Sequence, residues 1–174
     1  VAGNVLFAFR VDYRKEAEKC RELSEVYLKG LADNEAFQAA LPTDMQEYYT
    51  SEVYYKQFYE MRRLVYGNGV SAYFREASLV RVSDGTILAG TGIWNGRPIA
   101  ELYTDAALQL AISTVNEGKY QLAEIRSGDR RYFLGCVPAA QDDYVLVGVL
   151  STKFDFYEWR NVLIRDVLIG LGAY

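Results

Sequence analysis

The sequence predicts an α+β fold in which an antiparallel sheet of five strands is flanked by helices. Two tight-turn signals, SDGT at 83–86 and SGD at 127–129, each join a pair of β-rich segments, as in β-hairpins. The segment Tyr144–Leu150 is almost free of polar residues, which is typical of a central strand covered on both faces. The remaining segments space their apolar residues as helices do.

A long helix is expected in the N-terminal third. Its apolar and small residues recur at intervals of three and four and form one narrow stripe on an otherwise charged helix, namely Tyr13, Ala17, Cys20, Ser24, Tyr27 and Leu31. The spacing is close to a heptad repeat, so one interpretation is a parallel partner helix. The other interpretation is packing on the chain's own sheet. We expect a homodimer through this helix.

A second helix is expected to begin at residues 42–46. There Thr43 serves as the cap and Gln46 reaches back in a capping box, and Gly67 marks the end. Apolar residues share one face of this helix, while tyrosines surround it. This pattern is typical of a helix between two surfaces, one of which can be a ligand cavity. The shared face carries Tyr54, Phe58, Met61 and Val65.

The rest of the chain alternates strands and helices. A helix at 98–116 stops at Gly118, and a last helix is capped by Thr152 with Asp155. We expect strands at 78–82, 87–89, 120–126, 131–137 and 144–150, and the last helix from 153 to about 171.

Composition limits the function. The chain has 174 residues, the size of one domain, with 51% hydrophobic residues and a net charge of −4. An acidic chain is a poor partner for nucleic acid. Without histidine the usual zinc ligand sets and the Ser-His and Cys-His nucleophiles are excluded. No phosphate-binding glycine loop occurs, and we expect no enzyme, no cofactor and no metal. The pair Asp142-Asp143 is interpreted as a solvated turn, and Cys20 and Cys136 as two buried free thiols.

Both ends of the chain are apolar. Val1–Phe9 and Val167–Tyr174 carry no charge, but each is shorter than the ~20 residues that span a bilayer. One interpretation is a domain cut from between two membrane helices. The other is a core strand at the start and an amphipathic helix at the end. We divide the single domain into a helical part (1–69), a sheet core (70–152) and a C-terminal helix (153–174).

Four motifs carry a resemblance to a known family. They are the strand and turn LVRVSDGTILAGT, the helix entry NGRPIAELYTDAALQLA, the hairpin RSGDRRYFLGCVPA and the strand DDYVLVGVLST. From Ser78 to Phe154 the chain resembles an extracytoplasmic Cache-type sensor domain, a relative of the PAS fold. The resemblance implies a PAS-like five-stranded antiparallel sheet with a long N-terminal helix and flanking helices. The motif of the amino-acid-binding branch is absent, since Met61-Arg62-Arg63 lacks the following Trp-Tyr.

The function that this resemblance implies is small-molecule sensing outside the cytoplasm. Family members between two membrane helices are sensor parts of plasma-membrane receptors, whose outputs include histidine kinases, nucleotide cyclases, phosphatases and chemotaxis modules. We therefore expect a membrane-anchored receptor domain. The alternative is a cytosolic PAS-like interaction or dimerisation domain without a small ligand.

Arginine is the residue expected to bind an anionic ligand, because its guanidinium offers two parallel donors to a carboxylate. Arg81 interrupts an otherwise apolar strand, and Arg126 lies in the second hairpin. With both in the site, the ligand is an organic acid or a similar molecule. The alternative for Arg81 is exposure to solvent or pairing with Glu124 or Asp84.

Three aromatic residues complete the expected ligand site. Trp94 and Tyr103 flank the loop that follows the first hairpin, and Tyr132 alternates with Leu134 and Cys136 on one face of its strand. Rings with a polar tip suit a pocket that needs stacking and a hydrogen bond. The alternative is that Trp94 and Tyr103 cover the core and that Tyr132 packs under a helix.

Overall fold

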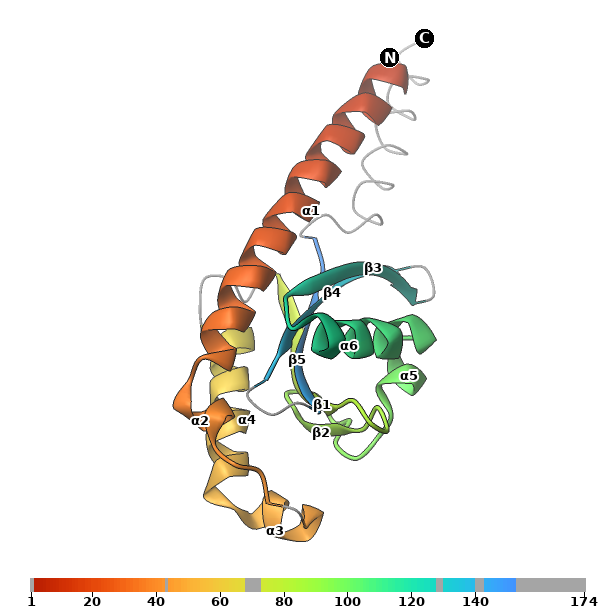
Figure 1. The fold of residues 1–174 in the computed structure, drawn as a ribbon. Helices are drawn as coiled ribbons and strands as arrows, with labels where there is room; N and C mark the ends of the chain where they lie inside the picture. Colours follow the sequence, from red (N-terminus) through yellow and green to blue (C-terminus); the bar gives the residue numbers. More distant parts are fainter. Residues whose placement is uncertain (1, 43, 68–72, 128–129, 140–142, 153–174) are drawn as a thin grey trace.

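The computed structural model of the chain describes residues 2–42, 44–67, 73–127, 130–139 and 143–152 (Figure 1). The C-terminal helix expected from residue 153 lies outside these residues. The elements in chain order are α1 (Ala2–Ala32), α2 (Glu35–Gln38), α3 (Met45–Thr50), α4 (Glu52–Tyr66), β1 (Phe74–Arg81), β2 (Ile87–Gly90), α5 (Ile99–Leu102), α6 (Asp105–Glu117), β3 (Gln121–Ser127), β4 (Arg130–Pro138) and β5 (Tyr144–Leu150).

The five strands form one antiparallel sheet in the order β2-β1-β5-β4-β3. The strand expected to be central, β5, lies in the middle, between β1 and β4. Helices α1 and α4 cover one face of the sheet, and α5 and α6 cover the other (Figure 1). The predicted α+β class, with a PAS-like five-stranded antiparallel sheet, a long N-terminal helix and flanking helices, is confirmed.

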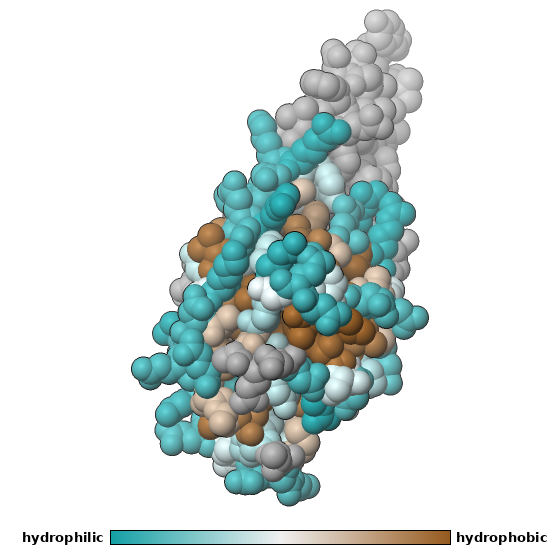
Figure 2. All heavy atoms as spheres, viewed as in Figure 1, coloured by the Kyte–Doolittle hydropathy of each residue, from teal (hydrophilic) through white to brown (hydrophobic). Residues whose placement is uncertain are grey.

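Strand alternation divides the apolar core in two. On β4, Phe133 and Val137 belong to the core beneath α1 and α4, while Leu134 and Cys136 belong to the core beneath α6. Tyr132 packs against the second core, so the predicted shared face of Tyr132, Leu134 and Cys136 is confirmed. We call these the α1 face and the α6 face of the sheet. The surface over α6 includes a patch of apolar side chains (Figure 2), where half-buried residues of this helix are Leu108, Leu110, Ile112 and Val115.

Helix α1 rests on bare backbone at the middle of the sheet. Gly135 on β4 and Gly148 on β5 are register partners beneath this helix. A Cβ at Gly135 would lie 1.8 Å from Ser24 Oγ, and one at Gly148 would lie 3.0 Å from the Leu28 methyl groups. Glycine at both positions therefore allows a helix-to-sheet approach that any side chain would prevent.

The predicted stripe of α1 faces this sheet. Cys20 and Ser24 are fully buried, Leu31 is nearly so, and Tyr13, Ala17 and Tyr27 pack against the same core. Of the two interpretations of the stripe, packing on the chain's own sheet is confirmed. Both cysteines are buried and free, as predicted.

Several predicted boundaries are wrong. The start of the chain is not a core strand, because α1 begins at Ala2. The helix expected from residue 43 is broken at Ser51, which ends α3 and caps α4 by accepting from the Tyr54 N–H. Its first cap is Asp44, which accepts from the Gln46 N–H at 2.8 Å, while Thr43 lies outside the described residues. The short α2 was not predicted.

The helix predicted at 98–116 is also two helices. Helix α5 ends at Leu102 and α6 starts at Asp105, with Tyr103 as the residue that follows α5. The predicted stop is confirmed, because Gly118 adopts the left-handed conformation with φ 63°. None of the helices within the described residues combines the length and the apolar character that a bilayer-spanning segment needs.

We expect Gly135→Ala to destabilise the protein by about 2–3 kcal/mol, because the new methyl group overpacks the contact with Ser24. Urea unfolding measures the change. Gly30→Ala on α1 is the matched control. A methyl group there meets nothing within 4 Å, so this change should stabilise the helix by about 0.5–1 kcal/mol. Equal stability of the wild-type protein and Gly135→Ala would contradict the close approach.

Candidate functional site

A glutamate lies at the centre of the candidate site. Glu76 extends from β1 on the α6 face, half-buried. Its Oε1 accepts a hydrogen bond from the Trp94 indole N–H at 3.3 Å, and its Oε2 accepts one from the Tyr103 hydroxyl. Glu76, Trp94, Tyr103 and Tyr132 together are called the carboxylate–aromatic cluster below.

The loop between β2 and α5 places Trp94. Backbone bonds hold this loop to β2, since Ile87 donates to the Arg97 carbonyl at 3.0 Å and Gly96 donates to the Ile87 carbonyl at 2.8 Å. The Trp94 indole packs directly on Gly92, where a Cβ would lie 2.6 Å from the ring carbon Cδ1. The absence of a side chain at Gly92 therefore leaves the space in which the indole reaches Glu76.

Tyr103 reaches Glu76 from the end of α5. This one-turn helix is fixed by Ile99, which is buried and whose N–H donates to the Gly85 carbonyl at 2.9 Å. Burial raises the pKa of the Tyr103 hydroxyl strongly, and the hydrogen bond to the Glu76 carboxylate raises it further. Tyr103 is therefore a protonated donor at neutral pH.

Tyr132 completes the cluster from β4. It lies opposite Ile125 of β3, and its phenol is near enough to Tyr103 to raise the pKa of that residue. Within the described residues the Tyr132 hydroxyl has no hydrogen-bond partner. The cluster thus carries a hydroxyl near Tyr103 that is unpaired within the described part of the chain.

Arg97 lies beside the cluster but is already paired. Its guanidinium is 5.3 Å from the centre of the Trp94 ring, and its Nε and Nη2 donate to Glu101 at 3.1 and 2.8 Å. Both side chains of this pair are half-exposed. Glu76, by contrast, forms no salt bridge with a lysine or arginine in the described part of the chain.

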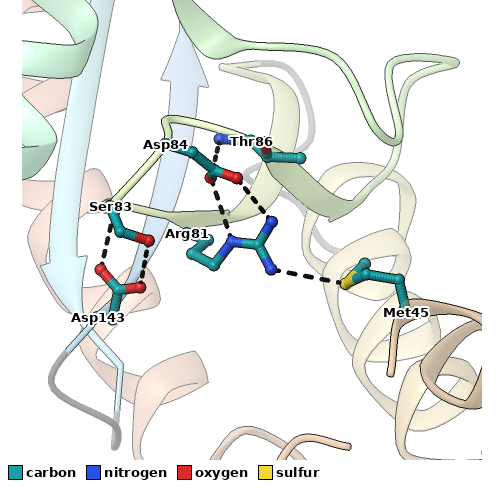
Figure 3. A network of polar contacts seen from close by, with 6 residues as sticks. All are labelled: Met45, Arg81, Ser83, Asp84, Thr86 and Asp143. Atoms are coloured by element: carbon teal, nitrogen blue, oxygen red, sulfur yellow. Dashed lines mark hydrogen bonds and ion pairs between the residues drawn. The ribbon is translucent and has the colours of Figure 1, made fainter. Parts of the chain in front are cut away.

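Arg81 lies on the other face of the sheet. It lies two residues after Leu79 in β1 and therefore shares the face of Leu79, which belongs to the core beneath α1 and α4. Its Nε and Nη2 donate to the two carboxylate oxygens of Asp84 at 3.1 and 2.6 Å, and its Nη1 lies 3.8 Å from Met45 Sδ (Figure 3). Pairing with Asp84, one of the alternatives for Arg81, is confirmed.

The same network joins two turns of the sheet. Asp143 accepts from the Ser83 N–H at 2.8 Å and from the Ser83 hydroxyl at 2.6 Å (Figure 3). Asp84 also accepts from the Thr86 N–H at 3.0 Å. Asp143 therefore does more than the solvated turn predicted for it, because it ties the β4–β5 connection to the β1–β2 hairpin.

Arg126 is also apart from the cluster. Strand alternation places it with Leu122 and Glu124 on the α1 face, and its side chain is exposed. Of the five predicted site residues, the structure brings together Trp94, Tyr103 and Tyr132 and separates Arg81 and Arg126 from them.

Glu76 was missed because the first strand was expected to start at Ser78. The strand begins at Phe74. Glu76, Ser78 and Val80 are every second residue of this strand, so all three point toward α5 and α6. The sequence signal for the site was therefore a charged residue on the same strand face as buried Val80.

Comparison with known protein families finds no matching family model, and comparison with curated proteins finds no significant match. Function is therefore argued from the fold and from the chemistry of the carboxylate–aromatic cluster. No group of three or more carboxylates or thiols able to hold a metal gathers within the described residues.

We expect Arg81→Gln to lower stability at pH 7 by about 1 kcal/mol, because the ion pair with Asp84 is partly exposed. The hydrogen bond from Arg81, together with smaller contributions from Thr86, lowers the pKa of Asp84 to about 2. The stabilisation is therefore complete above the usual Asp pKa of about 4 and is lost as the pH falls toward 2. Urea unfolding at pH 7, 4 and 2 should show the difference between the two proteins shrinking. Arg97→Gln, which breaks a more exposed pair, is the control.

Gly92→Ala should displace the Trp94 indole and break its hydrogen bond to Glu76. In a Trp159→Phe background, Trp94 is the single tryptophan of the chain. We expect its emission to shift to longer wavelength and its quenching by iodide to increase as the ring becomes more exposed. Unchanged emission would contradict the packing of Trp94 on Gly92.

Proposed function

We propose that this chain is a small-molecule-sensing domain of the Cache type, standing outside the cytoplasm in a membrane-anchored signal transduction protein. The output is a histidine kinase, a nucleotide cyclase, a phosphatase or a chemoreceptor module. The observation that carries the proposal is the carboxylate–aromatic cluster on the sheet face covered by α5 and α6. Aromatic side chains with a few converging polar groups are typical of small-molecule sites.

A polar link between α1 and the sheet supports a role in sensing. The Tyr13 hydroxyl of α1 donates to Glu124 Oε1 at 3.1 Å, and Arg131 Nη1 donates to the same oxygen at 3.2 Å. The Arg131 guanidinium lies 5.8 Å from the centre of the Tyr13 ring. Arg131 is the neighbour of Tyr132 along β4, so a ligand that moves Tyr132 acts one residue away from this link.

Helix α1 is suited to pass such a change on. Its N-terminal part extends well beyond the sheet (Figure 1). A ligand shifts the arrangement of α1 only if it binds two arrangements with different affinity. The proposed homodimer uses the side of α1 turned away from the sheet, where Val26 is 66% exposed, because the apolar stripe is buried.

A second candidate is a PAS-like interaction domain in the cytosol that binds no small ligand. Tyrosines at the surface of α4 favour it, because aromatic residues are enriched in protein interfaces. They are Tyr55, Tyr59 and Tyr66, with exposed fractions of 53%, 66% and 63%.

Thermal unfolding against organic acids, amino acids, amines, sugars and nucleobases tests the first proposal. A ligand at about 100 times its dissociation constant adds about 2.7 kcal/mol, a shift of several degrees for a domain of this size. We expect Trp94→Ala and Tyr132→Ala to lose the shift and Arg81→Gln to keep it. A panel without any shift would favour the interaction domain, whereas a shift that persists in both aromatic variants would contradict the cluster as the binding site.

A further inference from the structure

The charge of Glu76 is the feature of the cluster that remains unbalanced. Its two described partners, the Trp94 N–H and the Tyr103 hydroxyl, are neutral donors. Neutral donors stabilise a carboxylate without cancelling its charge. Within the described residues the nearby cation, Arg97, is bound to Glu101. Counted over the described cluster and the Arg97–Glu101 pair, one negative charge, that of Glu76, is left without a cationic partner.

We propose that the carboxylate–aromatic cluster binds a small organic cation with a protonated primary amine, and that Glu76 is its counter-ion. This inference rests on the proposed sensing function and names the ligand class of the same site.

Glu76 has acceptor capacity left for such a group. A carboxylate oxygen has two lone-pair sites, and each oxygen of Glu76 uses one of them for a described partner. An ammonium group donates up to three hydrogen bonds and pairs with a carboxylate in a charge-assisted bond. The Tyr132 hydroxyl, which has no partner among the described residues, is a further acceptor near Tyr103.

The rings around Glu76 suit the same ligand. A cation is attracted to the face of an aromatic ring, most strongly where water is excluded. The Arg97 guanidinium lies 5.3 Å from the centre of the Trp94 ring, so one cation–π contact is already present next to the cluster. Tyr103 and Tyr132 pack against the second core and offer further ring surface for the carbon skeleton of the ligand.

An anionic ligand lacks a matching partner in the described site. The expectation of an organic acid depended on Arg81 and Arg126. Arg81 is engaged by both oxygens of Asp84, and Arg126 lies on the α1 face. A carboxylate placed in the cluster would instead face Glu76, and like charges at short distance repel.

Titration of the 174-residue chain with matched compounds tests the ligand class. The amines are butylamine, 1,4-diaminobutane and 2-phenylethylamine. Their counterparts are 1-butanol, butyrate, 2-phenylethanol and phenylacetate. Trp94 emission in the Trp159→Phe background and the unfolding temperature are measured for each compound. We expect at least one amine to bind and its alcohol and acid counterparts to bind at least about tenfold more weakly, because only the amine forms the charge-assisted bond.

Glu76→Gln keeps the size of the side chain and removes its charge, and should weaken amine binding about tenfold to a hundredfold. Glu25→Gln, which removes a carboxylate paired with Lys29 on α1, is the matched control and should leave binding unchanged. The comparison of amine with alcohol uses the wild-type protein, so it tests the ligand class even if Glu76→Gln fails to fold.

The outcomes separate the two proposals. Binding of an acid or an alcohol in preference to the amine, with Trp94 responding, overturns the cation site and leaves the sensing function standing. Amine binding that is equal in wild-type and Glu76→Gln also overturns the assignment of Glu76. Absence of binding by every compound here and in the wider panel overturns both.

Discussion

The packing of helix α1 on the sheet depends on its contact with two central glycines. Gly135 and Gly148 face each other on neighbouring strands, and Ser24 and Leu28 of α1 occupy the space above them. Because a Cβ at either position would press on these side chains, the distance between α1 and the sheet is set by helix side chains that rest directly on the backbone of the sheet. The α1 face is filled at its centre by this helix, which leaves the α6 face for the cluster around Glu76.

Strand β4 contributes side chains to both faces of the sheet and so connects the cluster on one face with α1 on the other. Successive residues of β4 point to opposite faces, so Tyr132 belongs to the cluster while Arg131 and Phe133 belong to the α1 side. Tyr13 and Arg131 meet at one oxygen of Glu124. Under the proposed function, a ligand that displaces β4 at Tyr132 would therefore disturb a polar contact of α1.

Local signals explain what the sequence could predict. The turn at Gly85, the helix stop at Gly118 and the apolar strand Tyr144–Leu150 depend on backbone conformation or burial within a short window, and each lies where expected. The breaks at Ser51 and Tyr103 depend on what the helices pack against, which periodicity does not contain. The aromatic members of the cluster were found because they stand out by residue type. Glu76 was missed, and the faces of Arg81 and Arg126 were unknown, because the face that α6 covers is decided by the tertiary structure.

Charge distinguishes the two polar networks of the sheet more clearly than residue type does. Arg81 and Asp84 form a bidentate pair at a turn, so the charges cancel and the network needs no ligand. Glu76 has the same kind of carboxylate but neutral partners, half-buried between rings. A carboxylate that loses part of its hydration without gaining an opposite charge is stabilised by whatever cation fits beside it. A neutral residue that bonds to Trp94 and Tyr103 would stabilise the fold equally well. A purely structural role therefore does not explain the negative charge of Glu76, whereas the proposed cationic ligand does.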